Sequence, residues 1–256
     1  MLFSNTFGSG TPVLLIHGFC ESSVIWANLQ SKLSIDYQVI TIDLPGFGRS
    51  TLSDSLHSLN DVADEISHFL VSKKISSCFV IGHSLGGYVA LALAQNNPEI
   101  VLGFGLFHST TFPDDAEKRK TRDKIVKHVQ NYGLEAWTNG FIQNLFHSEA
   151  HNKHKESIET LKQIASQTSI DTFSAYSEFM KNRIDSNRLL TSFQKPVFII
   201  AGEQDIAVPL KQALDIRDQI VNGDSLILKK TGHMGFIERE KECTSFIKSF
   251  LKKNLK

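Results

Sequence analysis

The stretch Phe79-Val80-Ile81-Gly82-His83-Ser84-Leu85-Gly86-Gly87 joins an apolar run to a Gly-x-Ser-x-Gly pattern. The apolar run predicts a buried strand, and the small residues that follow predict a helix. Glycine on each side of Ser84 permits a strained turn in which flanking side chains would clash. We therefore expect the Ser84 hydroxyl to stand exposed at the N-terminus of the helix, where free N–H groups point outward.

The surroundings of this pattern decide its meaning, because a short glycine and serine pattern also arises by chance. Residues 78–81 are apolar before the turn, and residues 89–94 continue as a small, apolar helix after it. That helix is expected to stop at Asn97-Pro98, because proline opposes its continuation. The order of strand, tight turn and helix favours a nucleophilic serine over a chance pattern.

Further apolar runs predict the rest of a sheet. An edge strand is expected at residues 2–7, and buried strands at residues 13–19, 39–43, 101–107, 196–202 and 225–229. Segments with helical spacing separate these runs, one of them beginning after Ser22 and Ser23 and another at Asn60 or Asp61. Alternating strands and helices predict right-handed crossovers and a mainly parallel sheet.

Residues 111–190 have a different character, since they are polar, helix-forming and poor in β-runs. We predict that this stretch, called the cap segment below, is an inserted helical lid. The core would then consist of residues 1–110 and 191–256. The charged run at residues 114–124 is expected to form a solvated helix face.

Composition narrows the class of protein. The 256 residues are 41% hydrophobic, and 27 basic residues balance 27 acidic ones, so neither nucleic acid nor an anionic membrane is an expected partner. The first residues carry no basic segment followed by a long apolar one, which predicts neither a signal peptide nor a transmembrane helix. Three scattered cysteines fit a reduced, cytoplasmic protein. The sequence leaves the oligomeric state open.

Ser84, Asp205 and His233 are the candidates for a nucleophile, an orienting acid and a base. A serine hydroxyl is a weak nucleophile that needs a base held by a third group. Asp205 follows one predicted strand and His233 follows the last one. Each of these two also fits an ordinary loop, but parallel strands bring their carboxyl ends to one edge. We therefore predict a catalytic triad that performs acyl transfer.

Two backbone N–H groups are the candidates for an oxyanion hole. His17-Gly18 ends a predicted strand, and this glycine allows the N–H of Phe19 to face a cleft. The N–H of Leu85 follows the nucleophile directly. Together they would hold the negative charge that develops on a substrate carbonyl oxygen.

Other polar residues have plainer interpretations. The competing histidines are His17, His83 and His108. His83 is adjacent to the nucleophile and is expected to point elsewhere because of the turn, and His108 is the best alternative polar group in the pocket. Asp43 and Arg49 are expected to satisfy loop backbone. No metal or cofactor is predicted, since no suitably spaced acid or cysteine accompanies the neighbouring histidines at positions 147, 151 and 154.

Five segments resemble the α/β-hydrolase fold superfamily: His17-Gly18-Phe19, residues 43–50, residues 82–87, residues 202–205 and residues 232–238. Within it, the chain is similar to small serine carboxylesterases with a helical cap. The resemblance implies an α/β fold with a mostly parallel twisted sheet, flanking helices and an inserted cap. It also implies hydrolysis of a small-molecule carboxylic ester with a short apolar acyl group. The short segment before Val13 leaves little room for the family's first strand.

Several activities share these core motifs. Haloalkane dehalogenases carry aspartate at the position of Ser84 and do not fit. Thioesterases, lactonases, C–C bond hydrolases and cofactor-free perhydrolases keep the serine and stay open. A small-molecule receptor with slow hydrolysis is the alternative from another class.

Side chains of the cap segment are expected to determine which of these substrate classes the protein binds. Its arginines at positions 119, 122 and 183 either hold a substrate carboxylate or, as we expect, lie on solvated helix faces. Its large apolar residues either line an acyl pocket or pack the segment onto the core, and the latter is expected for more than half of them. They are Phe112, Trp137, Phe141, Phe146, Phe173, Tyr176, Phe179 and Met180.

Overall fold

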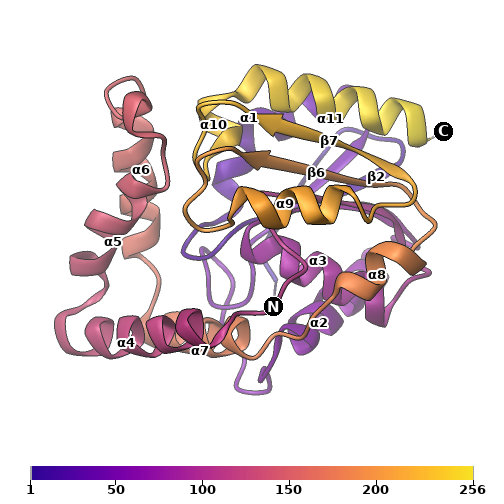
Figure 1. Ribbon diagram of the computed structural model, residues 1–256. Coiled ribbons are helices and arrows are strands. Elements are labelled where there is room, and N and C mark those ends of the chain that lie inside the picture. The colour runs from indigo at the N-terminus through magenta and orange to yellow at the C-terminus, as the bar shows by residue number, and fades with distance from the viewer. Residues whose placement is uncertain (1, 256) are drawn as a thin grey trace.

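A seven-stranded sheet forms the centre of the molecule in a computed structural model that describes residues 2–255 (Figure 1). The strand order is β1-β3-β2-β4-β5-β6-β7. Only the edge strand β1 runs antiparallel to its neighbour β3, and every other pair is parallel. The strands are β1 (Ser4–Phe7), β2 (Pro12–Ile16), β3 (Gln38–Ile42), β4 (Cys78–His83), β5 (Val101–Phe107), β6 (Val197–Gly202) and β7 (Gly223–Leu228). The predicted α/β architecture is thereby confirmed.

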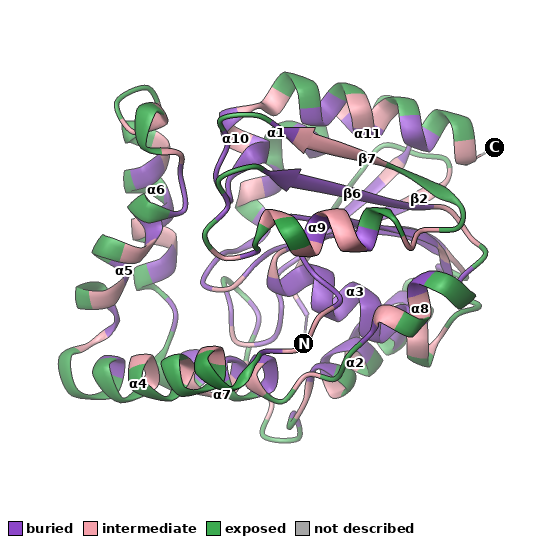
Figure 2. Cartoon of the chain, in the orientation of Figure 1, coloured by how far each residue is buried: buried purple, intermediate pink, exposed green. Residues whose placement is uncertain are grey.

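Helices cover both faces of this sheet, which explains why the central strands are apolar on both sides. One face packs against α2 (Leu59–Ser72), α3 (Leu85–Asn96), α8 (Asn187–Ser192) and α9 (Leu210–Arg217). The other face packs against α1 (Ala27–Leu33) and α11 (Glu240–Asn254). Figure 2 shows the buried colour concentrated on β6 and on the helix sides that face the sheet.

Two helix starts differ from the sequence expectation. Helix α2 begins at Leu59, because the Ser58 hydroxyl accepts a hydrogen bond from Asp61 N–H at 3.2 Å and caps it. Ser22 makes no side-chain cap, and the chain enters α1 through a short 3-10 helix, η1 (Ser23–Trp26). The Asp43 carboxylate satisfies Ser23 N–H instead, at 2.7 Å.

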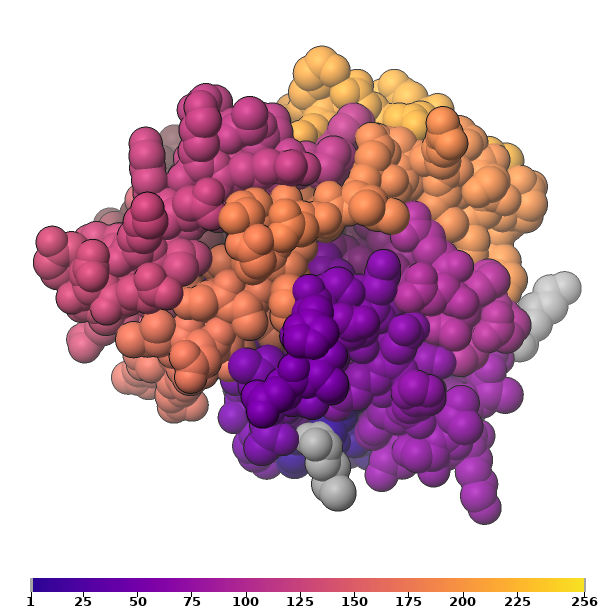
Figure 3. All heavy atoms as spheres, turned by 90° about the horizontal axis from the view of Figure 1, so that it is seen from below, coloured from indigo at the N-terminus to yellow at the C-terminus, as the bar shows by residue number. Residues whose placement is uncertain are grey.

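The cap segment holds four long helices beyond the carboxyl ends of the strands (Figure 1). They are α4 (Ala116–Tyr132), α5 (Leu134–Asn144), α6 (Lys155–Ser166) and α7 (Ile170–Lys181), with a 3-10 turn η2 (Ser148–Ala150) between α5 and α6. Helix α4 packs along α7, and α5 packs along α6. In Figure 3 the magenta and orange atoms of this segment gather on one side of the molecule. Helix α8 straddles the predicted boundary, and its Leu190 is part of the core.

No helix within residues 2–255 combines the length and the apolar character that a membrane crossing requires.

The turn at Ser84 joins β4 to α3 through a single residue. Ser84 has φ 50° and ψ −114°, in a region that side chains rarely adopt. A Cβ atom on Gly86 would overlap the carbonyl oxygen of Ile16, and one on Gly82 would overlap that of Gly86. These glycines therefore let α3 start directly against β2 and β4.

Gly86→Ala should lower the free energy of unfolding by about 2 kcal/mol or more, because the new methyl group meets rigid backbone. Gly140→Ala is the matched control, since a Cβ there meets nothing within 4 Å in the middle of α5. The free energy of unfolding of Gly140→Ala should rise by up to about 1 kcal/mol, because alanine has a higher helix propensity than glycine. Urea unfolding of both variants measures the difference, and equal effects would contradict this account of the turn.

Candidate active site

Ser84 stands between β4 and α3, at the carboxyl edge of the sheet. Its N–H donates to the Phe107 carbonyl at 2.9 Å, which ties the strained residue to β5. Its side chain is half-buried and borders a cavity of about 410 Å³. The wall of the cavity also includes His233 and Phe19.

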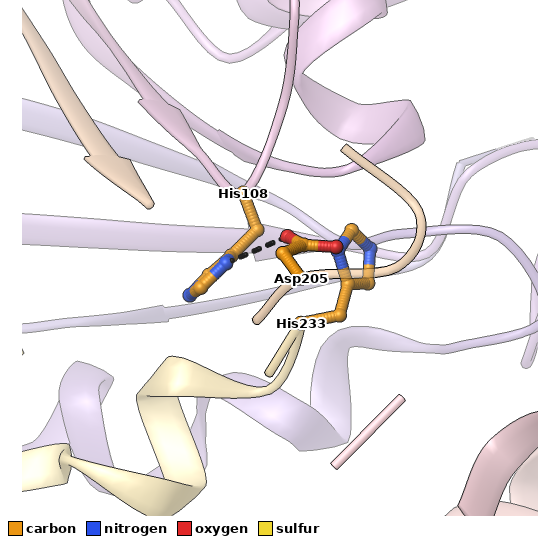
Figure 4. A group of neighbouring side chains, drawn as sticks. All are labelled: His108, Asp205 and His233. Carbon is orange, nitrogen blue, oxygen red and sulfur yellow. Dashed lines mark hydrogen bonds and ion pairs between the residues drawn. The ribbon is translucent and has the colours of Figure 1, made fainter. Parts of the chain in front are cut away.

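Asp205 and His233 lie side by side in the loops that follow β6 and β7 (Figure 4). His233 Nδ1 is 2.8 Å from Asp205 Oδ2. Burial raises the pKa of the Asp205 carboxyl, but the His233 imidazole and the hydrogen bonds from His108 and His233 outweigh it and hold the pKa below its usual range. An ionised carboxylate only accepts, so His233 donates from Nδ1 and a neutral ring keeps Nε2 free to accept a proton.

The loop after β6 fixes the second oxygen of this carboxylate. Asp205 Oδ1 accepts from the N–H groups of Ala207 and Val208 at 2.8 and 2.9 Å. The Asp205 side chain is fully buried. The backbone turn after Asp205 therefore fixes the orientation of the carboxylate independently of the two histidines.

His108 occupies a place that the sequence did not predict. Its ring is fully buried at the end of β5 and is absent from the cavity wall, so the expectation of a polar group in the pocket was wrong. Instead, its Nδ1 lies 3.0 Å from Asp205 Oδ2 (Figure 4). This is the oxygen that also contacts His233.

The N–H groups of Phe19 and Leu85 have no hydrogen-bond acceptor among residues 2–255. Phe19 borders the cavity, and Leu85 is the first residue of α3 after Ser84. Backbone donors left without a partner beside a cavity are available to an incoming oxygen.

Glu21 and His83 form a buried pair beneath the Phe19 loop, which sequence reasoning missed. Glu21 Oε2 accepts from Gly18 N–H at 2.6 Å and lies 3.0 Å from His83 Nδ1. The other ring nitrogen of His83 is 3.1 Å from the His233 carbonyl oxygen. One charged pair thus braces the loops of Phe19 and of His233. No local sequence pattern predicts this pair, because its two residues are 62 positions apart.

Each partner shifts the pKa of the other towards its charged form. Burial lowers the pKa of His83, but the Glu21 carboxylate outweighs it, so the pKa lies above 6.5. Burial raises the pKa of Glu21, but His83 outweighs it, so the pKa lies below 4.5.

The cavity has an apolar wall and a polar wall. Four of the large apolar residues of the cap segment border it, and the other four do not. Those on the wall are Trp137, Phe141, Phe173 and Met180. The polar wall includes Lys118, Thr121 and Arg122 of α4.

Most of the charged run at residues 114–124 is exposed, as expected, but Asp114 at its start is buried. Its carboxylate is fully buried and pairs with Arg122 and Arg183, so these two arginines do not simply face solvent. Asp43 accepts from the N–H groups of Ser23 and Arg49, at 2.7 and 2.9 Å, in keeping with its expected role in the loop backbone.

A metal ion would need ligands that are free to bind it. Among residues 2–255, His108, Asp205 and His233 each offer one atom, all within 4.8 Å of one another. The facing atoms are hydrogen-bonded to each other, which accounts for their closeness.

Comparisons with known proteins agree with this fold. The family model described as alpha/beta hydrolase fold matches residues 11–240. A pimeloyl-[acyl-carrier protein] methyl ester esterase of Vibrio campbellii is 25% identical over 93% of this chain and 94% of its own length. The uncharacterized hydrolase YugF of Bacillus subtilis is 25% identical over 94% and 89%.

Solved structures agree. A thermophilic esterase from Thermogutta terrifontis, solved with malate bound, superposes with a TM-score of 0.94 at 25% identity over 100% of this chain and 94% of its own. The enol-lactonase of Burkholderia xenovorans shares the fold, with a TM-score of 0.90 at 18% identity over 98% and 96%. This chain therefore belongs to the α/β-hydrolase fold family, and it is an enzyme of that family.

The Glu21–His83 pair predicts a particular pH dependence of stability. The lowered pKa of Glu21 contributes stability that is full above pH 4.5 and lost as the pH falls through the folded value. The raised pKa of His83 contributes stability that is full below pH 6.5 and lost as the pH rises through its folded value. The free energy of unfolding of wild type should therefore exceed that of Glu21→Gln by the largest amount between pH 4.5 and 6.5.

Urea unfolding of wild type and Glu21→Gln across a pH series tests this. Removing the charge of one partner of a buried pair should cost about 3 kcal/mol in that window. Glu117→Gln, at a highly exposed carboxylate on α4, is the control and should show a flat, small difference. A pH-independent deficit in Glu21→Gln would contradict the ionised pair.

Proposed function

We propose that this protein is a serine hydrolase of carboxylic esters in which Ser84 is the nucleophile, His233 the base and Asp205 the orienting acid. The observation that carries the proposal is the contact between His233 Nδ1 and Asp205 Oδ2 at 2.8 Å, on a ring that borders the same cavity as Ser84. A base oriented in this way, beside a serine on a strained turn, is the arrangement that acyl transfer needs.

In the first half of the reaction, His233 Nε2 takes the proton of the Ser84 hydroxyl as its oxygen attacks the ester carbonyl carbon. The carbonyl π bond opens, and its oxygen becomes an oxyanion held by the N–H groups of Phe19 and Leu85. Each such donor contributes about 3 kcal/mol to lowering the barrier. The carbonyl then re-forms, the alcohol leaves with the proton of His233, and the acyl group stays on Ser84.

In the second half, water enters the position of the alcohol and gives a proton to His233 as its oxygen attacks the acyl carbon. The same two N–H groups hold the second oxyanion. When this intermediate collapses, the bond to Ser84 breaks, its oxygen recovers the proton from His233 and the carboxylic acid leaves. Asp205 keeps its charge throughout and stabilises the imidazolium that forms twice.

The apolar wall of the cavity supports a short acyl group as the part of the substrate beside Ser84. Trp137 and Phe141 stack there with ring centroids 4.2 Å apart, and Phe173 lies 5.0 Å from Trp137. Burial of methylene groups against such rings contributes about 0.8 kcal/mol each. The esterase names of the relatives favour an ester over the other acyl donors.

Ser84→Ala should reduce hydrolysis of p-nitrophenyl butyrate to background while leaving the circular-dichroism spectrum unchanged. Ser72→Ala is the matched control, because that hydroxyl lies exposed at the end of α2 and bonds only Phe69 carbonyl. Labelling by a fluorophosphonate should occur in wild type and Ser72→Ala and disappear in Ser84→Ala. Unchanged turnover in Ser84→Ala would refute the assignment. Labelling with very slow turnover would favour a receptor.

A further inference from the structure

The polar wall of the cavity carries uncompensated positive charge. Lys118 and Arg122 stand one helical turn apart on α4, and both border the cavity that holds Ser84. The Lys118 ammonium lies 3.9 Å from Asp114 Oδ1, and Arg122 Nε bonds Asp114 Oδ2. No other carboxylate forms an ion pair with Lys118 or Arg122 in the described part of the chain.

Arg183 already neutralises that carboxylate from the other side. Its Nη1 lies 2.7 Å from Asp114 Oδ1, and its remaining donors bond the Phe112 and Met180 carbonyls. Three cations thus surround one buried carboxylate. The excess charge faces the cavity, because Arg183 is enclosed whereas Lys118 and Arg122 are partly exposed.

The remaining ionisable groups on the cavity wall do not balance this charge. Glu21 is committed to His83, and His233 is committed to Asp205. Lys118 Nζ donates one hydrogen bond to the Ala207 carbonyl at 3.0 Å. Arg122 bonds Asp114 through Nε and Nη2, so its Nη1 has no acceptor among residues 2–255. A guanidinium edge and an ammonium group side by side suit a carboxylate, which accepts several charge-assisted hydrogen bonds at once.

Resting on the proposed ester hydrolysis, we propose that Lys118 and Arg122 form a subsite for a carboxylate at the far end of the substrate. The substrate class is then the half-ester of a dicarboxylic acid. Its methylene chain lies against Trp137 and Phe141, its ester carbonyl meets Ser84, and its free carboxylate meets α4. This assignment explains why one wall of the cavity is apolar and the other basic.

The test compares monomethyl adipate with methyl pentanoate, which differ chiefly in the terminal carboxylate. Wild type should favour the half-ester in kcat/KM. Lys118→Met and Arg122→Gln should each lower the ratio of the two kcat/KM values about tenfold, the worth of a charge-assisted hydrogen bond. Lys120→Met is the control, since Lys120 lies largely exposed on α4 against Glu117, and its ratio should match wild type. Equal ratios in wild type and both subsite variants overturn the proposal.

A binding measurement separates this subsite from the hydrolysis itself. Adipate should raise the melting temperature of Ser84→Ala, and this rise should vanish in Ser84→Ala combined with Lys118→Met. If wild type turns over neither ester but the rise follows Lys118, the subsite stands and the hydrolysis fails. No rise in Ser84→Ala, or one that persists without Lys118, overturns the subsite.

An independent observation concerns the second histidine on Asp205. Gly235 N–H, at the start of α10 (Gly235–Glu238), donates to His108 Nε2 at 3.2 Å. A ring nitrogen that accepts carries no proton, so His108 is neutral and donates from Nδ1 to Asp205 Oδ2 at 3.0 Å. Burial agrees, since it lowers the pKa of His108 to about 4.

We infer that His108 is a positioning residue that tempers the carboxylate facing His233. The hydrogen bond from its Nδ1–H makes Asp205 Oδ2 a weaker acceptor for the N–H of His233. Without it, the carboxylate would stabilise protonated His233 more strongly, and the base would lose its free nitrogen at a higher pH. The hydrogen bond from His108 thus allows His233 to act as a base at a lower pH than it could without that bond.

His108→Leu should move the midpoint of the acidic limb of the kcat/KM profile to a pH about one unit higher. His108→Asn keeps a donor towards Asp205 and should bring the midpoint back towards wild type, which a purely structural role would not do. Coinciding midpoints in wild type and His108→Leu overturn the inference.

A measurement on wild type covers the case in which His108→Leu does not fold. In protein labelled with ¹⁵N-histidine, the resonances absent from His108→Asn should report the Nδ1–H tautomer near neutral pH. The Nε2–H tautomer would overturn the inference.

Discussion

The steric limit at Ser84 governs the arrangement of this protein. Its backbone at φ 50° persists only because Gly82 and Gly86 let helix α3 begin in contact with the sheet. The turn leaves Ser84 on the wall of a cavity, and the N–H of Leu85 follows it directly, without an acceptor among residues 2–255. Every other element of the proposed site is positioned relative to this fixed point, by strands that end at the same edge.

Asp205 is the electrostatic centre of that edge. It is buried, ionised and held by four hydrogen bonds, two from its own loop and two from imidazole rings. A second buried pair, Glu21 with His83, braces the loops on either side. Buried charges of this kind are costly unless each is satisfied, which ties the positions of the loops to one another. The geometry of the edge is thus maintained by charge pairing as well as by packing.

The predictable part of the molecule follows from local patterns. The strands ending near Ser84 and Asp205 were predicted within a few residues, because apolar runs and glycine turns act over short distances. The closeness of Asp205 and His233 followed from the parallel order of the strands. The roles of His108 and Glu21 were not predictable, since each depends on a partner far away in the sequence.

The sequence by itself determined a mainly parallel α/β fold, the strained turn at Ser84 and the edge at which its partners lie, because strand periodicity and glycine sterics are local properties. Tertiary structure alone decided that His83 borders the cavity beside His233 while His108 does not, and that Asp114 is buried rather than solvated. It also placed Lys118 and Arg122 on the cavity wall. Burial and charge pairing depend on what surrounds a side chain, and only the folded chain brings those neighbours together.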